Sequence, residues 1–428
     1  MRILHTSDWH LGHTLGGLSR RLEHQRFFEW LRDLCVDHQV DALLVTGDIF
    51  DSANPPASAF EDFYGLLADL RAAVPDLEVV VIGGNHDSPT RLEAPHPLLK
   101  SLRITVLGSL PRLETNSSGQ MPIDVQRVVV PLHDRDGLVR AWCVAIPYLR
   151  PADLATRWLA PSMADNVQDP LVEGVREVYT DAVEYAKGIR EPGQAIIATG
   201  HCYMAHGKLS ELSERKILGG NLHALPADLV SEDVSYLALG HLHLAQIVGN
   251  NSTRRYSGAP IPLHVDESHY PHQVVLVEFS GEHVQTVTSV RVPRAIEFLR
   301  VPETGVGSPD DVLAKLRELP NDTGDIPPPQ WPYLDIRVRL TDPMPDLRTK
   351  IETELANKVC RLVKITVETP GTYAALSDTI ANASLTELDP EFVFMKLHES
   401  RYGGPPKSLM LKTFRDIVNR IAEQGRPV

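Results

Sequence analysis

Five short polar motifs lie in the first 243 residues, nearly every one after an apolar run typical of a β-strand, and this repeated pairing constrains the fold more than any other feature. The motifs are Asp8-Trp9-His10, Gly47-Asp48-Ile49-Phe50-Asp51, Gly84-Asn85-His86-Asp87, Gly200-His201 and Gly240-His241-Leu242-His243. The runs that precede them cover 3–4, 42–45, 79–82, 195–198 and 236–239. Because loops at the carboxyl ends of strands form the ligand crevice of an α/β sheet, the motifs should converge on one point.

The residue types in these motifs point to metal ions. A single His or Asp at a strand end is more often a cap or a satisfied surface group than a ligand. The ordered set D-x-H, G-D-x-x-D, G-N-H-D, G-H and G-H-x-H within one domain is improbable by chance. Such ligands suit divalent metals, and their number is enough for two ions that share a carboxylate. Paired metals usually activate water against a phosphate ester, an amide or a related bond.

Hydrophobic periodicity predicts alternating strands and helices over the first part of the chain. Helices are expected near 20–38, 57–73 and 168–188, and strands near 272–279 and 284–291 close the region. A second series of strands and helices is expected after this region. The expected order is a strand at 296–301, a helix capped by Ser308, a half-buried strand at 334–340, a helix near 345–358 and a strand at 361–368.

Composition narrows the function classes. The chain has 428 residues, enough for two or three domains, and a net charge of −14, which is unusual for a protein that grips nucleic acid alone. No apolar stretch is long enough for a transmembrane helix, and no signal peptide is evident before Asp8. The four cysteines are widely spaced and form no C-x-x-C pair, as expected of reduced thiols. We therefore expect a cytoplasmic protein with no membrane partner.

The ordered motifs resemble those of the calcineurin-like metallophosphoesterase superfamily. Three stretches are similar to its SbcD-type DNA exonuclease subunits, bacterial relatives of the double-strand-break repair nuclease: 1–12, 210–220 and 240–260. The resemblance implies an α/β fold of two packed β-sheets flanked by helices, with a small αβ capping domain and a C-terminal helical tail. The expected divisions are a nuclease domain at 1–292, the capping domain at 293–371, and a linker with a two-helix partner-docking tail at 372–428.

The resemblance also implies a ligand set, motif by motif. One ion would be held by Asp8, His10 and His243. The other would be held by Asn85, His201 and His241, with Asp48 as the bridge. Mn²⁺ is the ion that the resemblance favours, although mixed nitrogen and oxygen ligation also admits Mg²⁺, Fe²⁺ and Zn²⁺.

Two residues of the third motif would act in catalysis. His86 is spare in the ligand count and would donate a proton or hydrogen bond to the leaving oxygen. Asp87 would orient His86, and capping of a turn is an equal alternative for it. Archaeal and eukaryotic relatives tend to carry His where this chain has Asp51, as in the bacterial subgroup. Ser52 and Asp87 depart from the pattern of the Ser/Thr protein phosphatases.

Because the chain is acidic, we expect weak DNA affinity until a dimer or partner adds binding surface. The residues expected to contact DNA are His13, Arg20, Arg21 and Lys208. The tail presents an apolar stripe made of Leu411, Phe414, Val418 and Ile421. Such a stripe is expected to pack against a protein surface. That surface is either its own domain or, as the resemblance implies, the coiled-coil base of an SbcC-type ATPase. The resemblance also implies a homodimer within a heterotetramer, formed through helices near 57–73 and 89–103.

Three functions are compatible with these features. The first is a metal-dependent nuclease that processes double-strand ends and hairpins in DNA repair and recombination. The second is a small-molecule phosphodiesterase or phosphatase of the same superfamily, which would need neither a capping domain nor a docking tail. The third is a scaffold that has lost its metals, which the complete ligand set disfavours.

Overall fold

The computed structural model describes residues 1–114, 121–158, 170–204, 224–341 and 344–368, with single residues between Phe394 and Phe414. The chain divides into two compact units, Met1–Ile296 and Glu297–Val428. In the described part of the chain, no helix has the length and apolar character needed to span a membrane.

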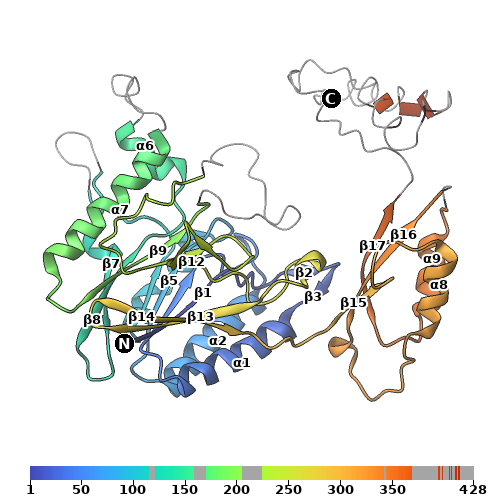
Figure 1. The fold of residues 1–428 in the computed structure, drawn as a ribbon, viewed down its shortest axis with the longest axis horizontal. Coiled ribbons are helices and arrows are strands. Elements are labelled where there is room, and N and C mark those ends of the chain that lie inside the picture. The colour runs from blue at the N-terminus through green and yellow to red at the C-terminus, as the bar shows by residue number, and fades with distance from the viewer. Residues whose placement is uncertain are drawn as a thin grey trace. The chain divides into compact units, whose positions relative to one another are not determined.

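Two six-stranded sheets form the centre of the first unit (Figure 1). The first has the order β14-β13-β1-β4-β5-β6, with bounds His283–Arg291, Gln273–Ser280, Arg2–Thr6, Ala42–Thr46, Glu78–Ile82 and Ile104–Leu107. The second has the order β11-β12-β10-β9-β8-β7, with bounds Gln246–Val248, Asn251–Tyr256, Tyr236–Gly240, Ala195–His201, Val139–Ala145 and Val129–His133. Short strands β2 (Thr14–Leu15) and β3 (Leu18–Ser19) pair separately.

Each sheet has a parallel centre, which places the carboxyl ends of its strands at one edge. Strands β1, β4, β5 and β6 run parallel, as do β8, β9, β10 and β12. Strand β13 joins β1 antiparallel, so a late segment of the chain completes the sheet beside the first strand. All five motifs therefore follow strands of these parallel centres.

The two sheets pack face to face because their strands are apolar on both sides, as is typical of parallel sheets. Ile3 and Leu44 belong to the core between the sheets, together with small side chains such as Ala238. The neighbouring residues Leu4 and Leu43 point into a second core beneath helices. The fold class is therefore confirmed: two packed sheets flanked by helices.

The flanking helices lie where the sequence predicts them. Helices α1 (Arg21–Asp37) and α2 (Ala57–Ala73) cover the first sheet, and α7 (Pro170–Ile189) covers the second. The remaining helical segments of this unit are α3 (Pro89–Glu93), α4 (His96–Lys100), α5 (Val125–Val128), α6 (Pro151–Trp158) and the short turn η2 (Val265–Glu267). The helix expected at 89–103 is two shorter ones, because Pro95 and Pro97 interrupt it.

The second unit contains the predicted β-α-β-α-β arrangement. Its parallel sheet has the order β15-β16-β17, and the elements are β15 (Phe298–Val301), α8 (Pro309–Glu318), β16 (Tyr333–Arg339), α9 (Leu347–Leu355) and β17 (Arg361–Glu368). Ser308 caps α8 by accepting the main-chain N–H of Asp311, as predicted. The prediction of a half-buried strand is wrong at Asp335, which is only 3% exposed because Arg300 and Arg337 both bond to its carboxylate.

The tail is described only at separate residues. The rings of Phe394 and Phe414 stack with their centroids 4.2 Å apart, so residues expected on two different helices contact each other. Leu411 is also described, whereas Val418, Ile421 and the linker near 372–388 lie outside the described residues.

Candidate metal centre

The seven residues of the expected ligand set meet at the carboxyl edge of both sheets. Asp8 and His10 follow β1, Asp48 follows β4, and Asn85 follows β5. From the second sheet, His201 ends β9, while His241 and His243 follow β10. Six of them, together with His86, form three overlapping groups in which one potential ligand atom from each residue lies within 4.8 Å of the others: Asp8 with His10 and His243, His10 with Asp48 and His86, and Asp48 with His201 and His241.

Asp48 lies between the two ends of this cluster. Its Oδ2 is 3.5 Å from His10 Nε2 on one side and 3.4 Å from His201 Nε2 on the other. Asn85 Oδ1 lies 2.9 Å from His201 Nε2 and 3.1 Å from His241 Nδ1. One carboxylate thus borders both histidine groups, which is the arrangement that a shared ligand requires.

The donor set fits divalent cations. Within the described residues, Nε2 of His10 is buried and has no hydrogen-bond partner. A buried polar atom is normally paired, and a metal ion can satisfy one that the rest of the protein does not. Two carboxylates, four imidazoles and an amide oxygen form a mixed nitrogen and oxygen set, which suits Mn²⁺ as well as other first-row ions.

Burial and neighbouring charges set the protonation state of each expected ligand. Burial would raise the pKa of Asp48, but the neighbouring His201 and His10 hold it well below its usual range. Burial would lower the pKa of His201, but Asp48 raises it to about 9. Burial, followed by the charge of His201, lowers the pKa of His241 to about 3. Asp48 is therefore ionised and His241 neutral, as metal ligation demands, whereas an ion bound at His201 would have to displace a proton from that ring.

The backbone is strained at the candidate ligands. Asp8, His10, Asp48 and His241 have positive φ angles of 54°, 49°, 49° and 102°. A non-glycine residue in this region costs roughly 1–3 kcal/mol and persists only where its surroundings enforce it. Four such residues in one cluster mark a site where ligand position takes precedence over local stability.

At two glycines of the motifs, another part of the chain approaches too closely for a side chain to fit. A Cβ on Gly84 would overlap the side chain and main chain of Asp48. A Cβ on Gly240 would overlap the main-chain oxygen of Thr46, which accepts a hydrogen bond from His201 Nδ1. These glycines let the loops of two strands approach closely enough for their side chains to meet.

The two predicted catalytic residues have different surroundings. His86 lies beside the cluster, with its ring centroid 4.7 Å from that of His10. Its Nδ1 donates to the main-chain oxygen of Asp51 at 2.8 Å. Asp87 accepts from the main-chain N–H groups of Ile49, Phe50 and Gly84, and no described contact joins it to His86. These contacts favour the alternative of turn capping for Asp87 over the orientation of His86.

The residues expected to contact DNA differ in their exposure and in their bonding partners. The prediction that Arg20 contacts DNA is wrong. Arg20 is 1% exposed and bonded to Glu23 and to the main-chain oxygen of Pro262, so it cannot reach a ligand in solvent. Arg21 lies at the surface and bonds to Asp62. His13 lies near the cluster, with Nδ1 3.0 Å from Asp51 Oδ1. Lys208 lies outside the described residues.

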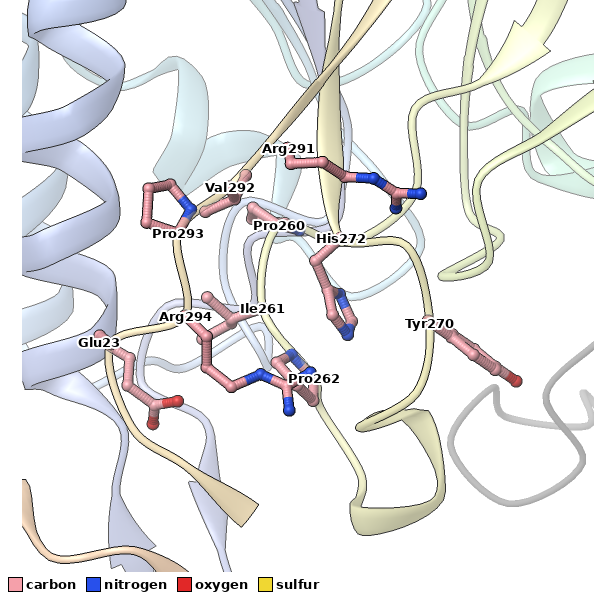
Figure 2. A pocket seen from close by; sticks show the side chains of 11 residues that line it. Glu23, Pro260, Ile261, Pro262, Tyr270, His272, Arg291, Val292, Pro293 and Arg294 are labelled. Carbon is pink, nitrogen blue, oxygen red and sulfur yellow. The ribbon is translucent and has the colours of Figure 1, made fainter.

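Sequence reasoning missed one buried carboxylate at the centre. Glu267 Oε1 accepts from His243 Nδ1 at 2.9 Å, although no motif contains Glu267. The segment that carries it also borders a pocket of about 180 Å³ (Figure 2). Pro260, His272 and Arg294 line this pocket, and no candidate ligand does. The pocket is thus separate from the metal cluster.

Comparison with known proteins agrees with this geometry. The family model described as calcineurin-like phosphoesterase matches residues 1–245, and a second one, described as a type 5 capsule protein repressor C-terminal domain, matches 292–402. The chain belongs to the calcineurin-like phosphoesterases, the class that the fold and the cluster define.

Named relatives place the chain more narrowly within this class. The D subunit of nuclease SbcCD from Rhodobacter capsulatus is 36% identical over 92% of this chain and 93% of its own length. The protein of the same name from Escherichia coli K12 is 34% identical over 82% and 81%. DNA double-strand break repair protein Mre11 of Methanosarcina acetivorans is 33% identical over 32% of this chain and 22% of its own. The chain belongs to the SbcD family of metal-dependent nuclease subunits.

Proposed function

We propose that this chain hydrolyses DNA phosphodiester bonds at a centre of two divalent ions. Asp8, His10 and His243 would hold one ion and Asn85, His201 and His241 the other. The observation that carries the proposal is the position of Asp48 Oδ2 between His10 Nε2 and His201 Nε2. The substrates that we propose are double-strand ends and hairpins, cleaved in exonuclease and endonuclease modes during repair and recombination. Relatives that bear nuclease and double-strand-break repair names support this proposal.

The chain's own residues prepare the reaction. When bound, two ions would neutralise phosphate charge and activate water as the nucleophile. The main-chain N–H of His86 donates to Asp48 Oδ1 at 2.9 Å, which fixes the carboxylate between the two histidine groups. Because His86 Nδ1 donates to the main-chain oxygen of Asp51, Nε2 faces the leaving oxygen as a donor only when the ring is doubly protonated, and this is the form that we propose for catalysis. We propose Mn²⁺ as the metal.

One assay tests the proposal. The purified chain with Mn²⁺ is incubated with linear duplex DNA, hairpin DNA and a small phosphodiester, each with a chelator control. Cleavage of DNA is expected, together with its loss in Asp48→Ala, whose metal analysis should show depletion at both positions. Cleavage of the small ester alone would favour the small-molecule phosphodiesterase. Two ions retained by Asp48→Ala would refute the shared-ligand assignment.

The partner that we propose is an SbcC-type coiled-coil ATPase, which binds the tail. Support comes from the relatives' names, which describe the D subunit of a nuclease called SbcCD. The contact between Phe394 and Phe414 supports a tail that folds as one docking element. Action on DNA together with this ATPase also supports the cytoplasm as the place of action.

We also propose a homodimer within a heterotetramer. Leu98 on α4 and Leu102 after it are 75% and 42% exposed, and such apolar side chains favour a protein interface. The acidic chain would double its DNA-binding surface in this way. Sedimentation at tens of micromolar tests the proposal, and a pure monomer that persists there would contradict it.

A further inference from the structure

The histidines of the centre differ in what contacts their second ring nitrogen. His243 Nδ1 donates to Glu267 Oε1 at 2.9 Å, and His10 Nδ1 lies 3.3 Å from Asp51 Oδ1. His201 Nδ1 instead donates to the main-chain oxygen of Thr46 at 2.9 Å. Both histidines on the Asp8 side of the centre thus have a carboxylate behind them, whereas His201 has a neutral carbonyl.

Glu267 is placed firmly by its surroundings. Its side chain is 0% exposed, and its Oε2 accepts the main-chain N–H of Leu263 at 2.8 Å. Its main-chain oxygen lies 3.0 Å from Nε2 of His272. The segment is tied to the metal loop as well, since the N–H of Ala259 donates to the oxygen of His243. Glu267 therefore acts on His243 from a fixed position.

The contact with Glu267 selects one tautomer of His243. A carboxylate accepts a hydrogen bond only from a protonated nitrogen, so Nδ1 carries the hydrogen and Nε2 is left as the electron-pair donor. A carboxylate behind a ligating imidazole also fixes its ring orientation and raises its basicity. Both effects strengthen a metal–nitrogen bond at Nε2, and neither requires that Glu267 touch the ion.

The two ends of the cluster consequently differ in negative charge. At the end that contains Asp8, the negative groups are the carboxylate of Asp8 and that of Asp48, which borders both ends. The carboxylates of Glu267 and Asp51 lie behind the two histidines of this end. The other end has its share of Asp48 and the neutral amide of Asn85. Among the described residues, no carboxylate except Asp48 contacts the imidazole ring of His201 or His241.

We propose that Glu267 is a positioning residue for His243, and that with Asp51 it makes the Asp8 end of the centre the tighter of two ion sites. This inference rests on the proposed two-ion centre. It assigns a sequence of loading: the first divalent ion enters at Asp8, His10 and His243, and the second completes the centre at Asn85, His201 and His241.

Calorimetric titration of the metal-free chain with Mn²⁺ tests the inference. The wild-type chain should bind two ions in steps of unequal affinity. Glu267→Gln keeps an oxygen acceptor of nearly the same shape and removes the charge. It should weaken the tighter step by the roughly 10–100-fold typical of a lost partner behind a metal ligand, and leave the weaker step unchanged. Glu191→Gln, an exposed carboxylate ahead of β9, is the matched control.

The outcomes separate the inference from the proposed function. If Glu267→Gln folds normally and binds both ions as the wild type does, the positioning role is wrong. Equal weakening of both steps would overturn the asymmetry between the two ends. A wild-type chain that takes up no ion would overturn the two-ion centre and this inference with it. Should Glu267→Gln fail to fold, Asp51→Asn tests the same asymmetry through His10, with the same predicted loss in the tighter step.

Discussion

The ring of His86 is held by the main chain of Asp51, whose carbonyl oxygen accepts from His86 Nδ1 at 2.8 Å. The side chain of the same Asp51 contacts the rings of His10 and His13. A single residue therefore orients both an expected metal ligand and the expected proton donor. Because the bond to His86 uses the backbone, substitution of the Asp51 side chain leaves this particular contact possible.

Replacement of His86 should separate catalysis from metal binding. In His86→Ala we expect DNA cleavage to fall by the ~10²–10⁴-fold typical of a lost general acid, while metal content stays at the wild-type level. The measurement is turnover with Mn²⁺, paired with metal analysis of the same sample. His86 also lies within 4.8 Å of potential ligand atoms of His10 and Asp48. Loss of an ion from His86→Ala would therefore show that His86 is a ligand.

Replacement of Asp87 should lower the stability of the fold, because its side chain bonds to the main chain of two loops. Its carboxylate accepts three main-chain N–H groups, and Asp87→Ala would leave those buried donors without an acceptor. Each unsatisfied donor costs about 1–3 kcal/mol, so we expect the free energy of unfolding to fall by at least ~3 kcal/mol. Urea denaturation of the metal-free protein measures this. A variant as stable as the wild type would show that water or a rearranged loop replaces the carboxylate.

Acid should destabilise the fold through His24. Burial, followed by the charge of Arg20, lowers its pKa to about 4, and its Nε2 donates to the main-chain oxygen of Trp9. The folded pKa lies below the unfolded value of about 6.5, so protonation favours the unfolded chain. The stability from neutral His24 is complete above about pH 6.5 and is lost as the pH falls towards 4.

The expected loss from His24 is on the order of 2 kcal/mol between pH 7 and pH 5. Urea denaturation in the presence of a chelator should therefore show a shallower pH dependence for His24→Gln than for the wild type. His283→Gln is the control, since His283 has a side chain that is 84% exposed. Equal slopes in the wild type and His24→Gln would mean that His24 is protonated within the fold.

Removal of the tail should abolish partner binding without affecting the chemistry. The expected ligands all lie before residue 244, so truncation after residue 380 should leave Mn²⁺-dependent cleavage of a small phosphodiester intact. Co-purification with an SbcC-type partner should be lost, as it should in the full-length Phe414→Asp, Val418→Asp variant. A buried large side chain contributes roughly 1.5–3 kcal/mol to such an interface. If both variants still bind the partner, the tail packs on its own domain and the interface lies elsewhere.

Local patterns predicted most of the fold and the meeting of the five motifs, because both depend on short stretches of chain, while the family resemblance supplied the expected ligand set. Each expected ligand follows a strand that hydrophobic periodicity reveals, and the parallel sheets then place those strand ends together. Glu267 was missed because it lies 24 residues after His243, beyond strands β11 and β12, and belongs to no motif. Arg20 was misplaced for a related reason: its hydrogen bond to Pro262 spans 242 residues, so nothing beside it in the sequence indicates burial.

The pairing of β1 with β13 has a consequence for the synthesis of this nuclease. The first strand is followed by Asp8 and His10, but one of its two sheet neighbours is residues 273–280, and the last expected ligand of the second sheet is His243. A chain still emerging from the ribosome has four of the seven expected ligands, Asp8 to Asn85, long before the other three. We therefore expect no cleavage by the nascent polypeptide until nearly the whole first unit has been translated.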